Sequence, residues 1–86
     1  MPRQLAIDTP LDCIIRVAGA LNARWSDRLG GLRVRAAGRG DLVTELSGRL
    51  LDQAALLGVL VTLYDLGLPL RSVGCRVAPR PTAVAP

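Results

Sequence analysis

Two cysteines and seven acidic residues are the side chains of this 86-residue sequence that could carry chemistry. Histidine is absent, and the acidic residues are scattered, whereas general acid–base catalysis usually needs a histidine or paired carboxylates in one pocket. Asp52 is explained as a helix cap and Asp65 as a solvated helix residue. We therefore expect a protein that is not an enzyme and that uses no metal and no cofactor.

The cysteines allow more than one interpretation. Cys13 and Cys75 do not form a CxxC pair, and two cysteines without histidine cannot make a usual closed zinc site. They form a disulfide, or one is a reactive thiol, or both are small residues that fill space in the core. We predict the last, two buried thiols facing inward on neighbouring strands, where their spacing would also permit a bridge.

The strongest structural signal is the segment from Asp52 to Val73. Asp52 suits a helix N-cap because its carboxylate can accept hydrogen bonds from the free amides of the first turn. Gly67 followed by Pro69 ends the helix. Between these signals, an apolar stripe has the spacing of a core-facing helix side. Its members are Leu56, Val59, Leu60, Leu63 and Leu66.

A second apolar stripe follows another side of the same helix. Its members are Leu57, Val61, Tyr64 and Leu68. A small domain has one core, so either the chain's own loops and tails cover this stripe or a partner does, since contiguous exposed apolar surface usually marks an interaction site. We predict an interface with a second copy, in a dimer or higher homo-oligomer, or with a larger protein.

The chain length and charge limit the class of protein to which this sequence can belong. A chain this short forms one domain with a thin core, which we place at residues 12–78, after a flexible lead-in (1–11) and before a flexible proline-rich tail (79–86). All eleven basic residues are arginine, and we attribute this use of arginine in place of lysine to a GC-rich coding bias. The formal net charge of +4 permits an anionic partner but does not require one. No apolar run spans a bilayer and no secretory signal is visible, so we predict a cytoplasmic bacterial protein without membrane contact.

Four segments alternate apolar and polar residues, the pattern of half-buried strands. They span residues 13–21, 32–36, 42–48 and 70–77. A short helix over 23–29, capped by Asn22, separates the first two strands, and the glycine-rich turn 37–41 joins the middle two. With the long helix the order becomes β-α-β-β-α-β, the split pattern of ferredoxin-like domains with a very short first helix. We therefore predict an α+β fold with a four-stranded antiparallel sheet.

The strand pattern also predicts a candidate face for an anionic partner. The side of the sheet away from the helices should carry Arg16, Arg33, Arg35 and Arg76. RNA-binding sheets of this topology use aromatic residues for base stacking, and none lies on these strands. We therefore predict no specific nucleic-acid partner.

Three stretches resemble a group of small, functionally unassigned proteins that are common in GC-rich bacteria. They are Arg24-Trp25 with Gly30-Gly31-Leu32, the Asp52-Gln-Ala-Ala-Leu56 run, and Asp65-Leu-Gly-Leu-Pro-Leu-Arg-Ser-Val73. The resemblance covers roughly residues 13–77. Members often carry polar residues where this chain has Leu57, Val61 and Tyr64, which strengthens the interface interpretation for this chain.

A weaker similarity, over Asp52 to Val73, is to the helix–strand unit of ACT regulatory domains. There, an Asp-initiated helix precedes a strand with a Leu-Gly-Leu and Ser-Val pattern. This resemblance implies an alternative function, a regulatory module that binds a small ligand at a subunit interface. A ligand-dependent shift in melting would favour this alternative, and an oligomer whose stability no metabolite changes would favour the interaction module.

Overall fold

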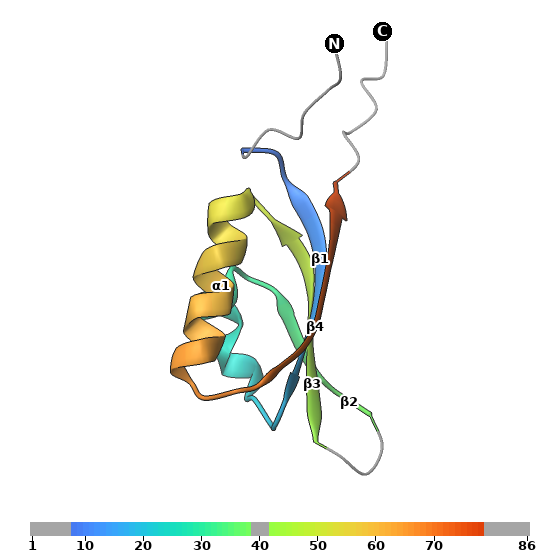
Figure 1. The fold of residues 1–86 in the computed structure, drawn as a ribbon, viewed down its shortest axis with the longest axis vertical. Helices are drawn as coiled ribbons and strands as arrows, with labels where there is room; N and C mark the ends of the chain where they lie inside the picture. Colours follow the sequence, from blue (N-terminus) through green and yellow to red (C-terminus); the bar gives the residue numbers. More distant parts are fainter. Residues whose placement is uncertain (1–7, 39–41, 79–86) are drawn as a thin grey trace, which may run out of the picture.

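A computed structural model describes residues 8–38 and 42–78, which form one sheet with two helices against it (Figure 1). The elements in chain order are β1 (Leu11–Ala18), η1 (Ala23–Leu29), β2 (Arg33–Ala37), β3 (Val43–Leu50), α1 (Gln53–Asp65) and β4 (Leu70–Val77). The strand order is β2-β3-β1-β4, and each neighbouring pair is antiparallel. The predicted α+β fold with a four-stranded antiparallel sheet is therefore confirmed.

The predicted helix boundaries follow local chemistry. The Asp52 carboxylate accepts a hydrogen bond from the amide of Ala55 at 2.8 Å, and so begins α1 as a cap. Gly67, with φ of 74°, follows the end of α1 in the left-handed region that favours glycine. Asn22 likewise caps η1, but η1 is a 3-10 helix rather than an α-helix.

The ends of β1 and β3 differ from the prediction. β1 ends at Ala18 rather than Leu21, because Gly19 turns the chain with φ of 110°. β3 continues to Leu50, two residues beyond Gly48, so the glycine is part of the strand. A Cβ at Gly48 would lie 3.3 Å from the Leu32 side chain, so glycine lets Leu32 pack closely on the sheet.

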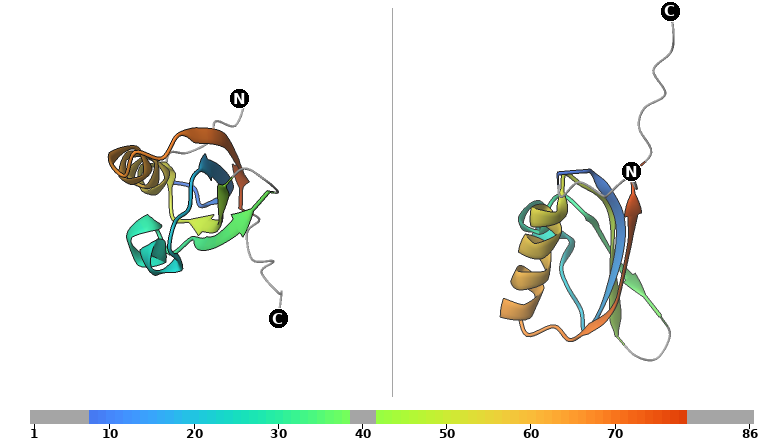
Figure 2. Two further views of the ribbon diagram at one scale, coloured as in Figure 1. Left: turned by 90° about the horizontal axis from the view of Figure 1, so that it is seen from below. Right: turned by 45° about the horizontal axis from the view of Figure 1, so that its top comes forward.

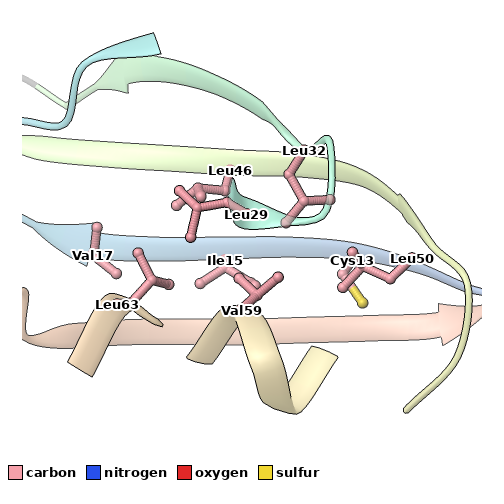
Figure 3. Close-up of a cluster of buried hydrophobic side chains, with 9 residues drawn as sticks. All are labelled: Cys13, Ile15, Val17, Leu29, Leu32, Leu46, Leu50, Val59 and Leu63. Carbon is pink, nitrogen blue, oxygen red and sulfur yellow. The ribbon is translucent and has the colours of Figure 1, made fainter. Parts of the chain in front are cut away.

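The core lies between the sheet and the helices. Figure 2 shows α1 and η1 beside each other on one face of the sheet, and Figure 3 shows the buried side chains between α1 and the strands. The cluster consists of Cys13, Ile15, Val17, Leu29, Leu32, Leu46, Leu50, Val59 and Leu63. It therefore takes residues from β1, β3 and both helices but none from β4.

β4 is an edge strand that the core does not cover. All eight of its residues are exposed, including Val73 and Cys75, whose neighbours Ile15 and Cys13 on β1 are buried. Alternation along residues 70–77 predicts that Val73, Cys75 and Val77 lie inward. The register places them on the core side of the sheet, but all three are exposed. β4 is the last strand of the sheet, and α1 lies closer to η1 and β3.

Parts of three predictions fall outside the described residues. They are the flexible lead-in at 1–7, the hairpin turn at 39–41 and the proline-rich tail at 79–86. Among the residues described, no helix is long and apolar enough to cross a bilayer.

Candidate interaction surfaces

α1 exposes apolar side chains on the side away from the core. Leu57, Val61 and Tyr64 are 56, 57 and 81% exposed, whereas Val59 and Leu63 of the same helix are each 2% exposed. The first three residues are spaced by four and three positions, so they are neighbours along one side of the helix. We call them the α1 stripe.

The fourth predicted member of this interface, Leu68, lies elsewhere. It follows the end of α1 and is partly buried against the core cluster. Its Cδ2 would stand only 2.9 Å from a Cβ built on Gly19. Leu68 therefore joins the helix to the core, and the exposed surface consists of the α1 stripe.

A second apolar surface lies on β4 and was missed from the sequence. Leu70, Val73 and Val77 are 54, 39 and 40% exposed. By register they share the helix side of the sheet with Val17, Ile15 and Leu11, their partners on β1. Alternation alone predicts that such residues are buried, and only the place of β4 at the edge shows that they are not.

A disulfide joins Cys13 to Cys75. The two residues lie directly opposite each other on β1 and β4, with Cα atoms 4.1 Å apart. The expectation that first and last strands would bring these cysteines together is confirmed, but the prediction of two buried thiols was wrong. The antiparallel register puts both sulfurs on the same face at one level, and only Cys13 is buried.

The predicted arginines share the outer face of the sheet, away from the helices. Arg16 and Arg35 both pair with Glu45 of β3, at 3.1 and 3.6 Å. By register, Arg33 and Arg76 lie on the same face. Glu45 therefore offsets part of the positive charge, and binding of an anionic partner at this face stays a prediction.

The outer face also holds an ion pair that the sequence did not reveal. Arg49 Nε donates to Asp12 Oδ1 at 3.0 Å, across the β1–β3 pair. This hydrogen bond is the largest influence and lowers the pKa of Asp12. Desolvation opposes it, and the positive charges of Arg49 and Arg76 lower the pKa further. The same bond raises the pKa of Arg49.

Asp12 and Arg49 border a shallow depression of about 740 Å³ on this face, with Ile14 among its lining residues. Ile14 is 50% exposed between charged neighbours. The described residues contain no group of three or more His, Cys, Asp or Glu side chains able to hold a metal ion. The depression is open to solvent, and its charged lining residues are Asp12, Arg49 and Arg76.

Residues 12–74 match the family model described as Domain of unknown function (DUF8691). The chain belongs to this family. The DUF8691 match begins in β1 and ends in β4, one residue before Cys75, and it includes the whole of α1. Neither the curated proteins nor the solved structures give a match.

The ion pair of the DUF8691 domain predicts a pH effect. We expect the Asp12 carboxyl to titrate below 3.8, the ordinary value, in carbon-detected NMR. Because the folded pKa is depressed, the contribution of this group to stability is present above the ordinary pKa and is lost as the pH falls through the folded pKa. Since the pair is exposed, the effect on stability is small.

Two variants of the DUF8691 domain test the cause of this shift. Arg49→Gln should return the pKa of Asp12 toward 3.8. Arg33→Gln removes an exposed arginine from the same face and should leave that pKa where it is. An Asp12 carboxyl that titrates at or above 3.8 in the unmodified protein would contradict the assigned hydrogen bond.

Proposed function

We propose that this DUF8691 protein is a non-catalytic interaction module, which self-associates or docks on a larger protein through the α1 stripe. The observation behind the proposal is that one helix buries Val59 and Leu63 while it exposes Leu57, Val61 and Tyr64. Full burial of such a side chain contributes about 1.5–3 kcal/mol, less the costs of association. Helix packing across a two-fold axis is the simplest closed arrangement that achieves this burial.

The proposal includes a ferredoxin-like assignment for the fold. Its support is that β1 and β4 pair with each other and that the hairpin strands β2 and β3 complete the sheet. The departure from that pattern is the first crossover, which holds the 3-10 helix η1. In this arrangement one long helix has to cover most of a sheet face, so β4 is left exposed.

A regulatory module that binds a small ligand is the alternative. Its support is the helix–strand unit formed by α1 and β4, the segment that resembles ACT domains. A ligand at a subunit interface would use the same exposed apolar surfaces. The two functions differ in whether association needs the ligand.

Melting at several protein concentrations tests the proposal. Self-association couples folding to protein concentration, so we expect the melting temperature to rise by about 4 °C for each tenfold increase in concentration. A panel of amino acids and nucleotides should leave the melting temperature unchanged at fixed protein concentration. A rise with one of these compounds would favour the ligand-binding alternative, and a melting temperature independent of protein concentration would contradict self-association.

A cytoplasmic location is part of the proposal, and the disulfide disfavours it, because cytosolic proteins rarely keep structural disulfides. Thiol labelling of protein quenched in acid directly from cells tests the location. Labelling of Cys13 and Cys75 would show reduced thiols, as a cytoplasmic location predicts, whereas an intact bridge points to an oxidising compartment.

A further inference from the structure

We propose that the open edge of β4 pairs antiparallel with β4 of a second copy, so that two sheets continue into one across a two-fold axis. This inference rests on the self-association proposed above and adds a backbone interface to it. Within residues 8–38 and 42–78, no strand pairs with the outer side of β4. β4 forms one border of the sheet in Figure 1.

Two backbone hydrogen bonds show which groups of β4 face outward. The amide of Ala78 donates to Pro10 at 2.9 Å, and the amide of Gly19 donates to Leu42 at 2.8 Å. β1 lies between β3 and β4, and the backbone groups of successive residues on such a central strand point alternately to the two neighbours. Even-numbered residues of β1 therefore hydrogen-bond to β4, and odd-numbered residues hydrogen-bond to β3. By register, Ser72, Gly74 and Arg76 bond β1. The residues between them present their amides and carbonyls to the open edge: Val73, Cys75 and Val77.

The Cys13–Cys75 pair agrees with this alternation. Its Cα atoms are 4.1 Å apart, nearer to the roughly 4.5 Å of a non-hydrogen-bonded pair than to the roughly 5.5 Å of a hydrogen-bonded one. The backbone groups of Cys75 are therefore not used by β1. They are available to a second strand.

The side chains of β4 fit opposite those of β4 in a second, antiparallel copy. With Gly74 on the axis, Arg76 stands opposite the second copy's Ser72, so no like charges meet. On the helix side, Val73 stands opposite the second copy's Cys75, and apolar surface meets apolar surface. This register pairs residues 71–77 of the two copies, which is all of β4 except Leu70.

The other sheet edge is a poorer partner. β2 has five residues and carries Arg33 and Arg35, and charged side chains on a short strand oppose edge pairing. Pairing of β4 with β2 would also be heterologous, which closes only where the rotation between copies completes a ring. Pairing of β4 with β4 closes after two copies.

Gly74 is a second indication of a close neighbour. A Cβ built on it would meet nothing within 4 Å, so the described part of the chain gives no steric reason for glycine there. Glycine inside a strand often marks the close approach of another backbone. On the proposed axis, the two Gly74 residues form a non-hydrogen-bonded pair, in which Cα atoms come closest.

Amide exchange of the unmodified protein, followed by NMR at high and low concentration, tests the pairing. We expect the outward amides of Val73, Cys75 and Val77 to exchange about tenfold or more slowly at high concentration than after dilution. The inward amides of Ser72 and Gly74 should be slow at both concentrations, because they bond β1. Light scattering on the same samples reports the mass.

Three results would overturn the proposal. If the protein assembles but its outward amides exchange freely, edge pairing is excluded, whereas the proposal of association through the α1 stripe still stands. Outward amides that stay protected in a sample that light scattering shows to be monomeric mean that a segment of the same chain covers the edge. A monomer at every concentration overturns both edge pairing and self-association.

A pair of variants gives an independent readout. Val73→Pro removes an outward donor without touching the bonds to β1, whereas Val73→Ala removes most of the side chain and keeps the donor. We expect the proline variant to raise the dimer dissociation constant about tenfold or more above that of the alanine variant. A slow Gly74 amide shows that the proline variant is folded, and equal dissociation constants would contradict the pairing.

Discussion

Reduction of the Cys13–Cys75 bridge is expected to lower the free energy of unfolding by about 4 kcal/mol. The bridge spans 62 positions, so its loss frees a long loop in the unfolded chain. That amount is a large part of the roughly 5–15 kcal/mol that stabilises a typical domain. Urea unfolding with and without dithiothreitol measures it, with the fluorescence of Trp25, which packs on the core, as the signal.

Cys75→Ser is the matched control for reduction. It removes the bond while it keeps the buried sulfur of Cys13, and Cys75 itself is exposed. We expect this variant to unfold at the same urea concentration as the reduced protein and to be insensitive to dithiothreitol. Equal unfolding energies for oxidised and reduced protein would show that the bridge does not constrain the chain.

The double change Leu57→Glu with Val61→Lys is expected to give a soluble, folded protein that no longer associates through the α1 stripe. It places two charges in the centre of the α1 stripe, where association would have to remove the water that solvates them. The lost burial of two apolar side chains in each copy should raise the dissociation constant about 100-fold or more. Sedimentation equilibrium measures the constant, and circular dichroism reports the fold.

Ala54→Glu with Gly58→Lys is the matched control on the same helix. Both positions are exposed, and a Cβ at Gly58 meets nothing within 4 Å. Each double variant adds one Glu–Lys pair at the same i, i+4 spacing. The control also replaces a glycine inside the helix, which favours the helix by up to about 1 kcal/mol. The control should associate like the unmodified protein. Dissociation of the control, or association of the stripe variant, would move the interface away from the α1 stripe.

Local chemistry made much of the fold predictable. Asp52 and Asn22 cap their helices because a short polar side chain can reach the amides of the turn that follows it. Alternation placed Arg16, Arg33 and Arg35 on one face of the sheet, since side chains on a strand alternate between its faces. These inferences need only residues close together in the chain.

The features that were missed depend on how distant segments are placed. Val73 faces the side of the core, yet it is exposed because β4 is the last strand of the sheet. Leu68 fits the spacing of the α1 stripe but lies beyond the helix end, where it packs on the core. The Cys13–Cys75 bridge and the Arg49–Asp12 pair follow from strand register, which no local pattern specifies.

Light scattering of the unmodified, oxidised protein tests self-association most directly. A dissociation constant of about 1 μM corresponds to roughly −8 kcal/mol, so a sample at about 100 μM should be almost fully assembled. We predict a mass of twice the 9.1 kDa of the chain, falling toward 9.1 kDa on dilution. A mass of 9.1 kDa in the concentrated sample would contradict self-association through the α1 stripe.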